Sequence, residues 1–230
     1  MAAAMRIQDG NIMDSNLSLR GIKHFFWDFD GTLWDTYPVI IEDLRLSLKE
    51  FGFDCDPVEA MHLMLDTIPA ARNHYADRFG IPRDALAAAY GRYHALSVRE
   101  LHSEPFDDLP EVLEQIQSIG GNSYIFTNRK ASETCAYLEK YGLSRYFRAV
   151  MGSESQGFAY KPSPNALFHL MDMYGIETSE AVMIGDRECD LESGRAAGMH
   201  TAHYVCSLAP EMLRCDWRIR SFSEMLALLR

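Results

Sequence analysis

The chain has 230 residues, of which 47% are apolar and 24% are charged, so it can bury a sizeable core and gives no reason to expect extensive disorder. Its length suits a core domain that carries a smaller insert. The formal net charge of −11 at pH 7 argues against a nucleic acid or an anionic membrane surface as partner, because both would repel an acidic chain at long range.

The cysteines and the N-terminal segment indicate where the protein works. The five cysteines are scattered, odd in number and without a C-x-x-C pair, so we expect neither a disulfide framework nor a zinc site. Residues 1–21 lack the apolar centre of a signal peptide, and no apolar run reaches the roughly 18 to 20 residues that span a bilayer. We therefore predict a cytoplasmic protein, and we interpret residues 1–20 as a leader without an assigned function.

Strand and helix patterns alternate over most of the chain. Short apolar runs, each followed by polar residues, predict strands at 23–29, 123–127, 149–151, 181–184 and 201–205. Amphipathic patterns predict helices at 110–119, 133–141 and 164–174, the last with Ser163 as a hydroxyl cap and Pro164 at its first position. This alternation predicts an α/β fold, a Rossmann-like doubly wound parallel sheet covered on both faces.

A long stretch without convincing strands separates the first strand from the second. Its helical segments are predicted at 39–51, 57–65, 69–79 and 82–102, and three of them open with proline. We therefore expect residues 36–106 to form an inserted helical domain, while residues 21–35 and 107–230 form the α/β core.

The clearest chemical motif is Asp28-Phe29-Asp30-Gly31-Thr32-Leu33, directly after the first predicted strand. A D-x-D-G sequence on its own usually marks a turn with solvated carboxylates. Here aromatic residues precede it and indicate a buried strand, and open α/β sheets place their ligand sites at such strand ends. We expect Gly31 to redirect the chain so that the two carboxylates serve different purposes.

A second acidic motif, Gly185 to Asp190, follows the apolar run at 181–184. Carboxylate oxygens suit Mg²⁺, so Asp28, Asp186 and Asp190 can converge on one ion if their strands are neighbours. A role for Asp190 as helix N-cap is nearly as strong an interpretation, and the two roles are compatible.

Two weaker signals lie between these acidic motifs. Thr127-Asn128 ends the second predicted core strand, where hydroxyl, amide and backbone N–H donors can bind phosphoryl oxygens. Lys161 precedes Pro162 in a loop and offers a positive charge to an anion and to its acidic neighbours. Taken singly, each is more often an ordinary loop residue.

The order of these four signals resembles the four motifs of the haloacid dehalogenase superfamily, over essentially residues 22–230. A helical insert directly after the first motif is similar to the first cap type of that superfamily, as in its phosphoglycolate phosphatase-like branch. The resemblance implies a Mg²⁺-dependent phosphatase that acts on a small phosphorylated metabolite through an aspartyl-phosphate.

The resemblance also implies a role for each motif residue. Asp28 would be the nucleophile and a Mg²⁺ ligand, and Asp30 the general acid and base, whose backbone carbonyl also contacts the metal. Asp186 would be a further metal ligand. Asp190 would lie next to the ligands without binding the metal itself. The remaining motif residues would bind and neutralise the phosphoryl group: Thr127, Asn128 and Lys161.

Several alternatives stay open within this resemblance. A sugar phosphomutase shares the core motifs and differs in how well the cap excludes water. A binding protein without catalysis is a further alternative, because fold alone does not establish function. Asp30 and Asp186 argue against a dehalogenase. Trp34 stands where the family usually has a smaller aliphatic residue; it could contact substrate or pack under the cap, and we favour packing. The role of Arg129, the substrate and the oligomeric state are left open.

Overall fold

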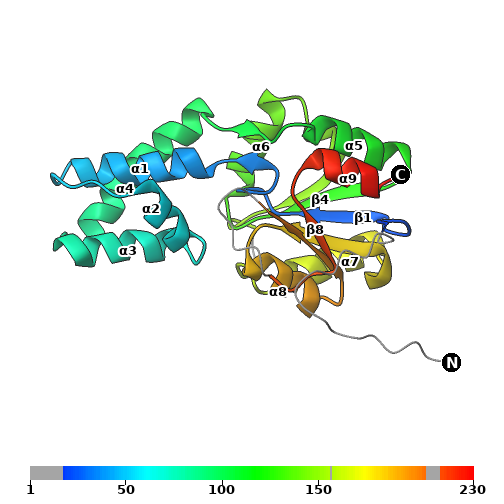
Figure 1. The fold of residues 1–230 in the computed structure, drawn as a ribbon. Coiled ribbons are helices and arrows are strands. Elements are labelled where there is room, and N and C mark those ends of the chain that lie inside the picture. Colours follow the sequence, from blue (N-terminus) through cyan, green and yellow to red (C-terminus); the bar gives the residue numbers. More distant parts are fainter. Residues whose placement is uncertain (1–17, 156, 206–212) are drawn as a thin grey trace, which may run out of the picture.

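The computed structural model describes residues 18–155, 157–205 and 213–230. They form an α/β core joined to a separate group of helices (Figure 1). The core sheet is parallel, with the order β5-β4-β1-β6-β7-β8. Its strands are β1 (His24–Trp27), β4 (Asn122–Phe126), β5 (Phe147–Met151), β6 (Ala181–Gly185), β7 (His200–Tyr204) and β8 (Trp217–Ile219). The predicted α/β class and doubly wound sheet are confirmed.

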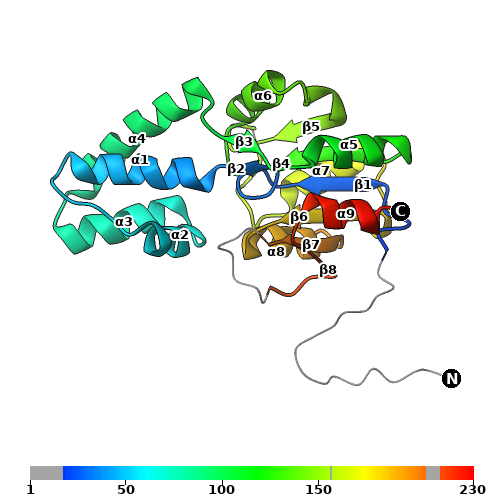
Figure 2. The same ribbon diagram turned by 45° about the horizontal axis from the view of Figure 1, so that its top comes forward.

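Helices cover both faces of this sheet (Figures 1 and 2). Alternate residues of β1 point to opposite faces, so that Phe25 and Trp27 join one apolar cluster and Phe26 joins another. The first cluster includes residues of α5 (Leu109–Ser118), α6 (Ala131–Lys140) and α9 (Phe222–Leu228). The second lies against α7 (Asn165–Tyr174), and α8 (Glu188–Ala196) follows β6. The core thus has three layers, helices on each face of a central sheet, with β1 in the middle of the sheet.

The inserted helices have an apolar cluster of their own. They are α1 (Tyr37–Lys49), α2 (Pro57–Met64), α3 (Ile68–Phe79) and α4 (Arg83–Glu100). Buried residues on the inner faces of these helices include Leu44, Tyr75 and Leu86. Within the described part of the chain, no helix is long and apolar enough to cross a membrane. Figure 2 shows these four helices, hereafter the cap, beside the carboxyl ends of the core strands.

Two short strands connect the cap to the core. β2 (Trp34–Asp35) and β3 (Glu104–Pro105) pair in antiparallel fashion, with Trp34 opposite Pro105. The sequence analysis anticipated neither, because two-residue strands carry no periodicity. The pair brings the entry to the cap and the exit from it side by side.

Two local expectations differ from the structure. Leu19 is buried and its N–H donates to the carbonyl of Leu228 at 3.0 Å, so the packed core begins before residue 21. Residues 1–17 of the expected leader lie outside the described part. Helix α7 begins at Asn165, with Pro164 as its N-cap residue and no side-chain cap bond, so Ser163 is not the cap.

Candidate active site

The site forms where β1 meets its two neighbours. β1 pairs in parallel with β4 on one side and with β6 on the other. Asp28 therefore follows the central strand, Thr127 and Asn128 follow β4, and Asp186 follows β6. Because parallel strands end at the same edge of the sheet, three sequence motifs that are far apart along the chain meet there.

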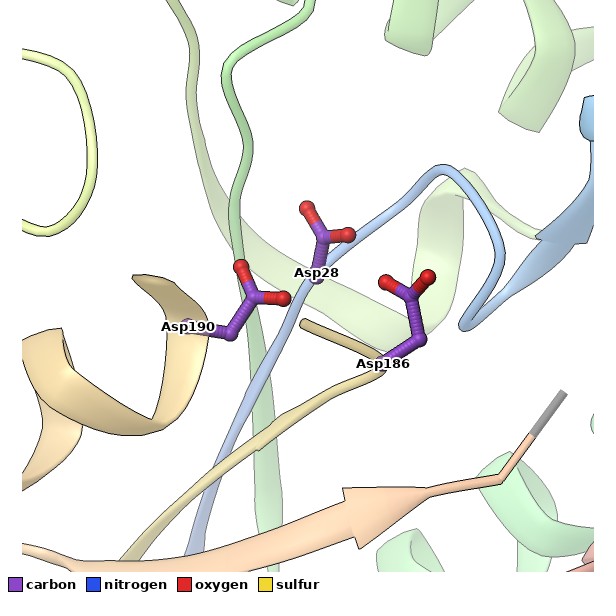
Figure 3. A group of neighbouring side chains, drawn as sticks. All are labelled: Asp28, Asp186 and Asp190. Carbon is purple, nitrogen blue, oxygen red and sulfur yellow. The ribbon is translucent and has the colours of Figure 1, made fainter. Parts of the chain in front are cut away.

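Three buried carboxylates lie together at this edge (Figure 3). Asp28, Asp186 and Asp190 each place a carboxylate oxygen within 4.8 Å of the others, and all three side chains are inaccessible to solvent. Burial raises the pKa of Asp28 to about 6, and Asp190 adds to this shift while Lys161 and Arg187 oppose it. Burial also raises the pKa of Asp186 well above its usual range. The arrangement is costly for free carboxylates and suited to a cation.

Lys161 supplies a positive charge inside this acidic group. Its ammonium contacts a carboxylate oxygen of Asp28 and lies 2.6 Å from Oδ1 of Asp190. Burial acts to lower the pKa of Lys161, but Asp190 and Asp28 outweigh this effect and the pKa is raised. The lysine is therefore charged at neutral pH. The backbone N–H of Lys161 donates to Oδ1 of Asn128 at 2.9 Å, so the second motif positions the third.

Asp190 is the third residue of α8 and not its N-cap, which corrects one of the two interpretations of this residue. Its Oδ2 accepts from the backbone N–H of Arg187 at 3.0 Å, and its Oδ1 faces Lys161. A Cβ added to Gly185 would lie 2.3 Å from the Cβ of Asp190, so only glycine allows this approach. Both carboxylate oxygens of Asp190 are thus engaged by the protein.

The residues present fit a divalent metal ion. The carboxylate oxygen Oδ2 of Asp28 is buried and has no hydrogen-bond partner among the described residues. Hard oxygen donors of this kind are those that Mg²⁺ and similar ions prefer. An unpartnered buried carboxylate oxygen is costly unless a cation or a donor faces it. The acidic cluster can therefore hold a divalent metal.

Asp30 is paired with an arginine. Its two oxygens accept from Arg129, with Nη2 at 2.7 Å from Oδ1 and Nε at 3.1 Å from Oδ2. Burial acts to raise the pKa of Asp30, but the Arg129 guanidinium outweighs it and lowers the pKa. Gly31, directly after Asp30, has a φ of 77°, where a side chain would be strained. The pKa of Asp28 is thus raised and that of Asp30 lowered, although both acids belong to the first motif.

Sequence reasoning missed two side chains of this site. The hydroxyl of Tyr37, at the start of α1, donates to Oδ2 of Asp186 at 2.7 Å. Arg187 places Nε 4.0 Å from Oδ1 of Asp186. A tyrosine two residues before a predicted helix looks like a packing residue, and an arginine between two acidic motif residues looks like a solvated one. Trp34, by contrast, is fully buried and stacks on Phe29, as a packing role requires.

Comparison with known proteins identifies the family. Residues 25–204, well over half of the chain, match the model of the haloacid dehalogenase-like hydrolases. The chain belongs to this family, as the order of its motifs predicts.

Relatives and solved structures narrow the class. The chain is 29% identical over 184 residues to the phosphoglycolate phosphatase of Thiobacillus denitrificans, covering 77% of this chain and 80% of that protein. It is 27% identical over 183 residues to the phosphoglycolate phosphatase of Aquifex aeolicus, covering 79% and 84%. Within its family the chain is accordingly a phosphatase.

A solved haloacid dehalogenase-superfamily hydrolase of Geobacter sulfurreducens has the same fold, with a TM-score of 0.71 and 26% identity over 91% of this chain and 97% of that one. A structure from Haemophilus somnus, described as a predicted phosphoglycolate phosphatase, gives a TM-score of 0.79 at 18% identity, covering 91% and 99%. The second likeness concerns the fold alone.

Proposed function

We propose that this protein is a cytoplasmic, Mg²⁺-dependent phosphatase that hydrolyses a small phosphomonoester through an aspartyl-phosphate on Asp28. The observation that carries the proposal is the environment of Asp28, whose one oxygen contacts the buried Lys161 ammonium while the other has no partner among the described residues. A carboxylate in this position can attack phosphorus while a lysine and a metal ion neutralise the phosphoryl oxygens.

The residues of the site would bind the metal ion, bind the phosphoryl group or position another side chain. Asp28, Asp186 and the backbone carbonyl of Asp30 would bind Mg²⁺, which supplies charge neutralisation when bound. Thr127, Asn128 and Lys161 would bind the phosphoryl group. Asp190 would position Lys161, because its own oxygens are already engaged.

Asp30 would act as general acid and base. In the first step it would protonate the leaving oxygen as Asp28 attacks phosphorus, and in the second its carboxylate would take a proton from the water that releases phosphate from Asp28. In the structure the Arg129 pair keeps Asp30 deprotonated, which is the base form. The acid form would require Asp30 to leave Arg129 and gain a proton.

The substrate we propose carries a second anionic group. Five cap arginines pair with carboxylates at 2.6 to 3.3 Å, namely Arg45, Arg78, Arg83, Arg92 and Arg99. Arg72 forms no such pair with a described residue, and its guanidinium lies 5.9 Å from the centre of the Tyr90 ring. An uncompensated arginine in the cap is suited to a carboxylate or phosphate.

Tyr90 relates this arginine to the core site. Its hydroxyl is buried and has no hydrogen-bond partner among the described residues. Burial raises the pKa of Tyr90, and Asp43, Arg129 and Asp30 also influence it. Because Asp30 and Arg129 belong to the core, their influence supports a location of the Tyr90 and Arg72 pair on the core-facing side of the cap. A phosphoglycolate-like substrate, named in the relatives, has the two charges that this arrangement would bind.

The test is a panel of phosphorylated metabolites assayed for kcat/KM with Mg²⁺ and with excess chelator. We expect hydrolysis of p-nitrophenyl phosphate with metal and none with chelator. Full activity in chelator would refute the proposed mechanism. Transfer of the phosphoryl group to a second hydroxyl of a sugar phosphate, in place of its release to water, would favour the phosphomutase. No turnover of any substrate, with retained ligand binding, would favour the binding protein.

A further inference from the structure

The first residue of the cap touches a proposed metal ligand of the core. Tyr37 opens α1, and its hydroxyl donates to Oδ2 of Asp186 at 2.7 Å. The tyrosine side chain is nearly inaccessible and that of Asp186 is fully buried. A hydrogen bond to a carboxylate in such surroundings is stronger than one at the surface, because water does not compete for either group.

The first motif provides the space for this contact. A Cβ added to Gly31 would lie 2.3 Å from Cε2 of Tyr37 and 2.7 Å from Oδ2 of Asp186. The bare backbone of Gly31 therefore lets the tyrosine ring reach the carboxylate. The three residues belong to the catalytic turn, to the cap and to the loop after β6, so the contact joins all three parts of the site.

The position of Tyr37 along the chain connects the two domains. α1 begins directly after the linker strand β2, on the side of the cap that faces the core (Figures 1 and 2). Asp186 follows β6 in the core sheet. Movement of the start of α1 relative to the core would therefore lengthen or break the hydrogen bond to Asp186.

We propose that Tyr37 is a positioning residue that orients Asp186 for the metal ion and couples metal binding to the attachment of the cap at the core. This inference rests on the proposed metal dependence. Donors that fix a metal-binding side chain typically change metal affinity by ten- to a hundredfold when removed. Because linkage is reciprocal, an ion that is bound better when the contact is intact also favours the intact contact.

The experiment compares Mn²⁺ binding by isothermal calorimetry in the wild type, Tyr37→Phe and Tyr75→Phe. Phenylalanine keeps the ring beside Gly31 and removes only the hydroxyl. Tyr75 is the matched control, because its hydroxyl donates to a carboxylate, Glu59, at 3.1 Å within the cap. We expect the Kd for Mn²⁺ to rise about tenfold in Tyr37→Phe and to stay unchanged in Tyr75→Phe.

A second measurement tests the coupling to the cap. Mn²⁺ should slow amide hydrogen exchange at the start of α1 in the wild type, and this protection should shrink in Tyr37→Phe. Thermal unfolding without metal shows whether both variants remain folded. An equal or tighter Mn²⁺ affinity in Tyr37→Phe would overturn the inference and leave the proposed function intact. Failure of the wild type to bind Mn²⁺ would reject the metal dependence itself, and the inference with it.

Discussion

Arg129 donates hydrogen bonds to both carboxylate oxygens of Asp30, and its guanidinium also lies 5.8 Å from the ring centres of Phe29 and Tyr137. The arginine side chain is only 5% exposed, so this ion pair is largely removed from water. The sequence analysis left the role of Arg129 open. In the structure its partner is the second acid of the first motif.

Replacing Arg129 by methionine should lower the free energy of unfolding by about 3 kcal/mol near neutral pH, because it leaves a buried carboxylate without its partner. In the wild type Arg129 lowers the pKa of Asp30, so the stabilisation is complete above the unfolded-state pKa, roughly 3.9, and is lost as pH falls through the lower native value. In the variant the largest influence that opposes burial is lost, so the pKa of Asp30 rises and the carboxylate takes up a proton at higher pH.

The difference in stability between the wild type and Arg129→Met should therefore shrink as the pH is lowered from neutral to about 5. Urea unfolding at both pH values measures it. Arg83→Met, which breaks an exposed pair with Asp77, is the control and should change stability far less. A difference that is constant over this pH range would mean that Arg129 stabilises by packing and not by its charge.

Asp28 and Asp30 should respond differently to the same substitution. Asp28→Asn should abolish phosphoenzyme formation with every substrate, since an amide is a poor nucleophile. In Asp30→Asn the attack on p-nitrophenyl phosphate should persist, because this leaving group needs little protonation, while hydrolysis of the phosphoenzyme slows. Phosphoenzyme should accumulate with this substrate and far less with an alkyl phosphate.

Rapid acid quench and mass spectrometry of the peptide that contains Asp28 provide the readout. Label on another residue, or continued phosphorylation of Asp28→Asn, would contradict the assignment of the nucleophile.

Removing the carboxylate of Asp186 should remove the metal. We expect Asp186→Ala to lose both calorimetric Mn²⁺ binding and phosphatase activity, because the side chain is buried beside Asp28 in the acidic cluster. Asp172→Ala, which changes an exposed residue of α7, should keep both. Wild-type metal affinity in Asp186→Ala would exclude this carboxylate as a ligand.

Excision of the cap should weaken both phosphate binding and substrate selectivity. The cap and core have distinct apolar clusters, and Asp35 lies opposite Glu104, so the chain enters and leaves the cap at neighbouring positions and a short linker can replace residues 36–106. The remaining core should bind phosphate poorly and discriminate little between substrates, because the cap no longer excludes water or contacts the leaving group. Relative kcat/KM values over the metabolite panel measure this. If the substrate ranking survives in a cooperatively folded core, selectivity resides in the core.

Arg72 should affect only substrates with a second charge. Arg72→Gln should lower kcat/KM for phosphoglycolate about ten- to a hundredfold, the value of one hydrogen bond between charged groups, and leave p-nitrophenyl phosphate hydrolysis nearly unchanged. Arg78→Gln is the control, since Arg78 already pairs with Glu59 in the cap. Equal losses with both substrates would assign Arg72 to cap folding or closure.

Local sequence patterns predicted the parts of this molecule that depend on neighbouring residues. Short continuous apolar runs located β1 and β6, and the stretch between the first two core strands showed helical patterns. The order of four short motifs predicted the family, because each motif directly follows a strand or precedes a helix. Short linker strands such as Trp34–Asp35 escaped detection, since two residues define no period.

Tertiary structure alone decided which side chains became partners. Lys161 and Asp28 lie 133 positions apart, Arg129 and Asp30 lie 99 apart, and Tyr37 and Asp186 lie 149 apart. Nothing near these residues in the chain specifies such pairs, because they arise from the order β5-β4-β1-β6 and from the attachment of the cap beside β1. Burial at that edge of the sheet then sets the pKa values, raising that of Asp28 while Arg129 lowers that of Asp30.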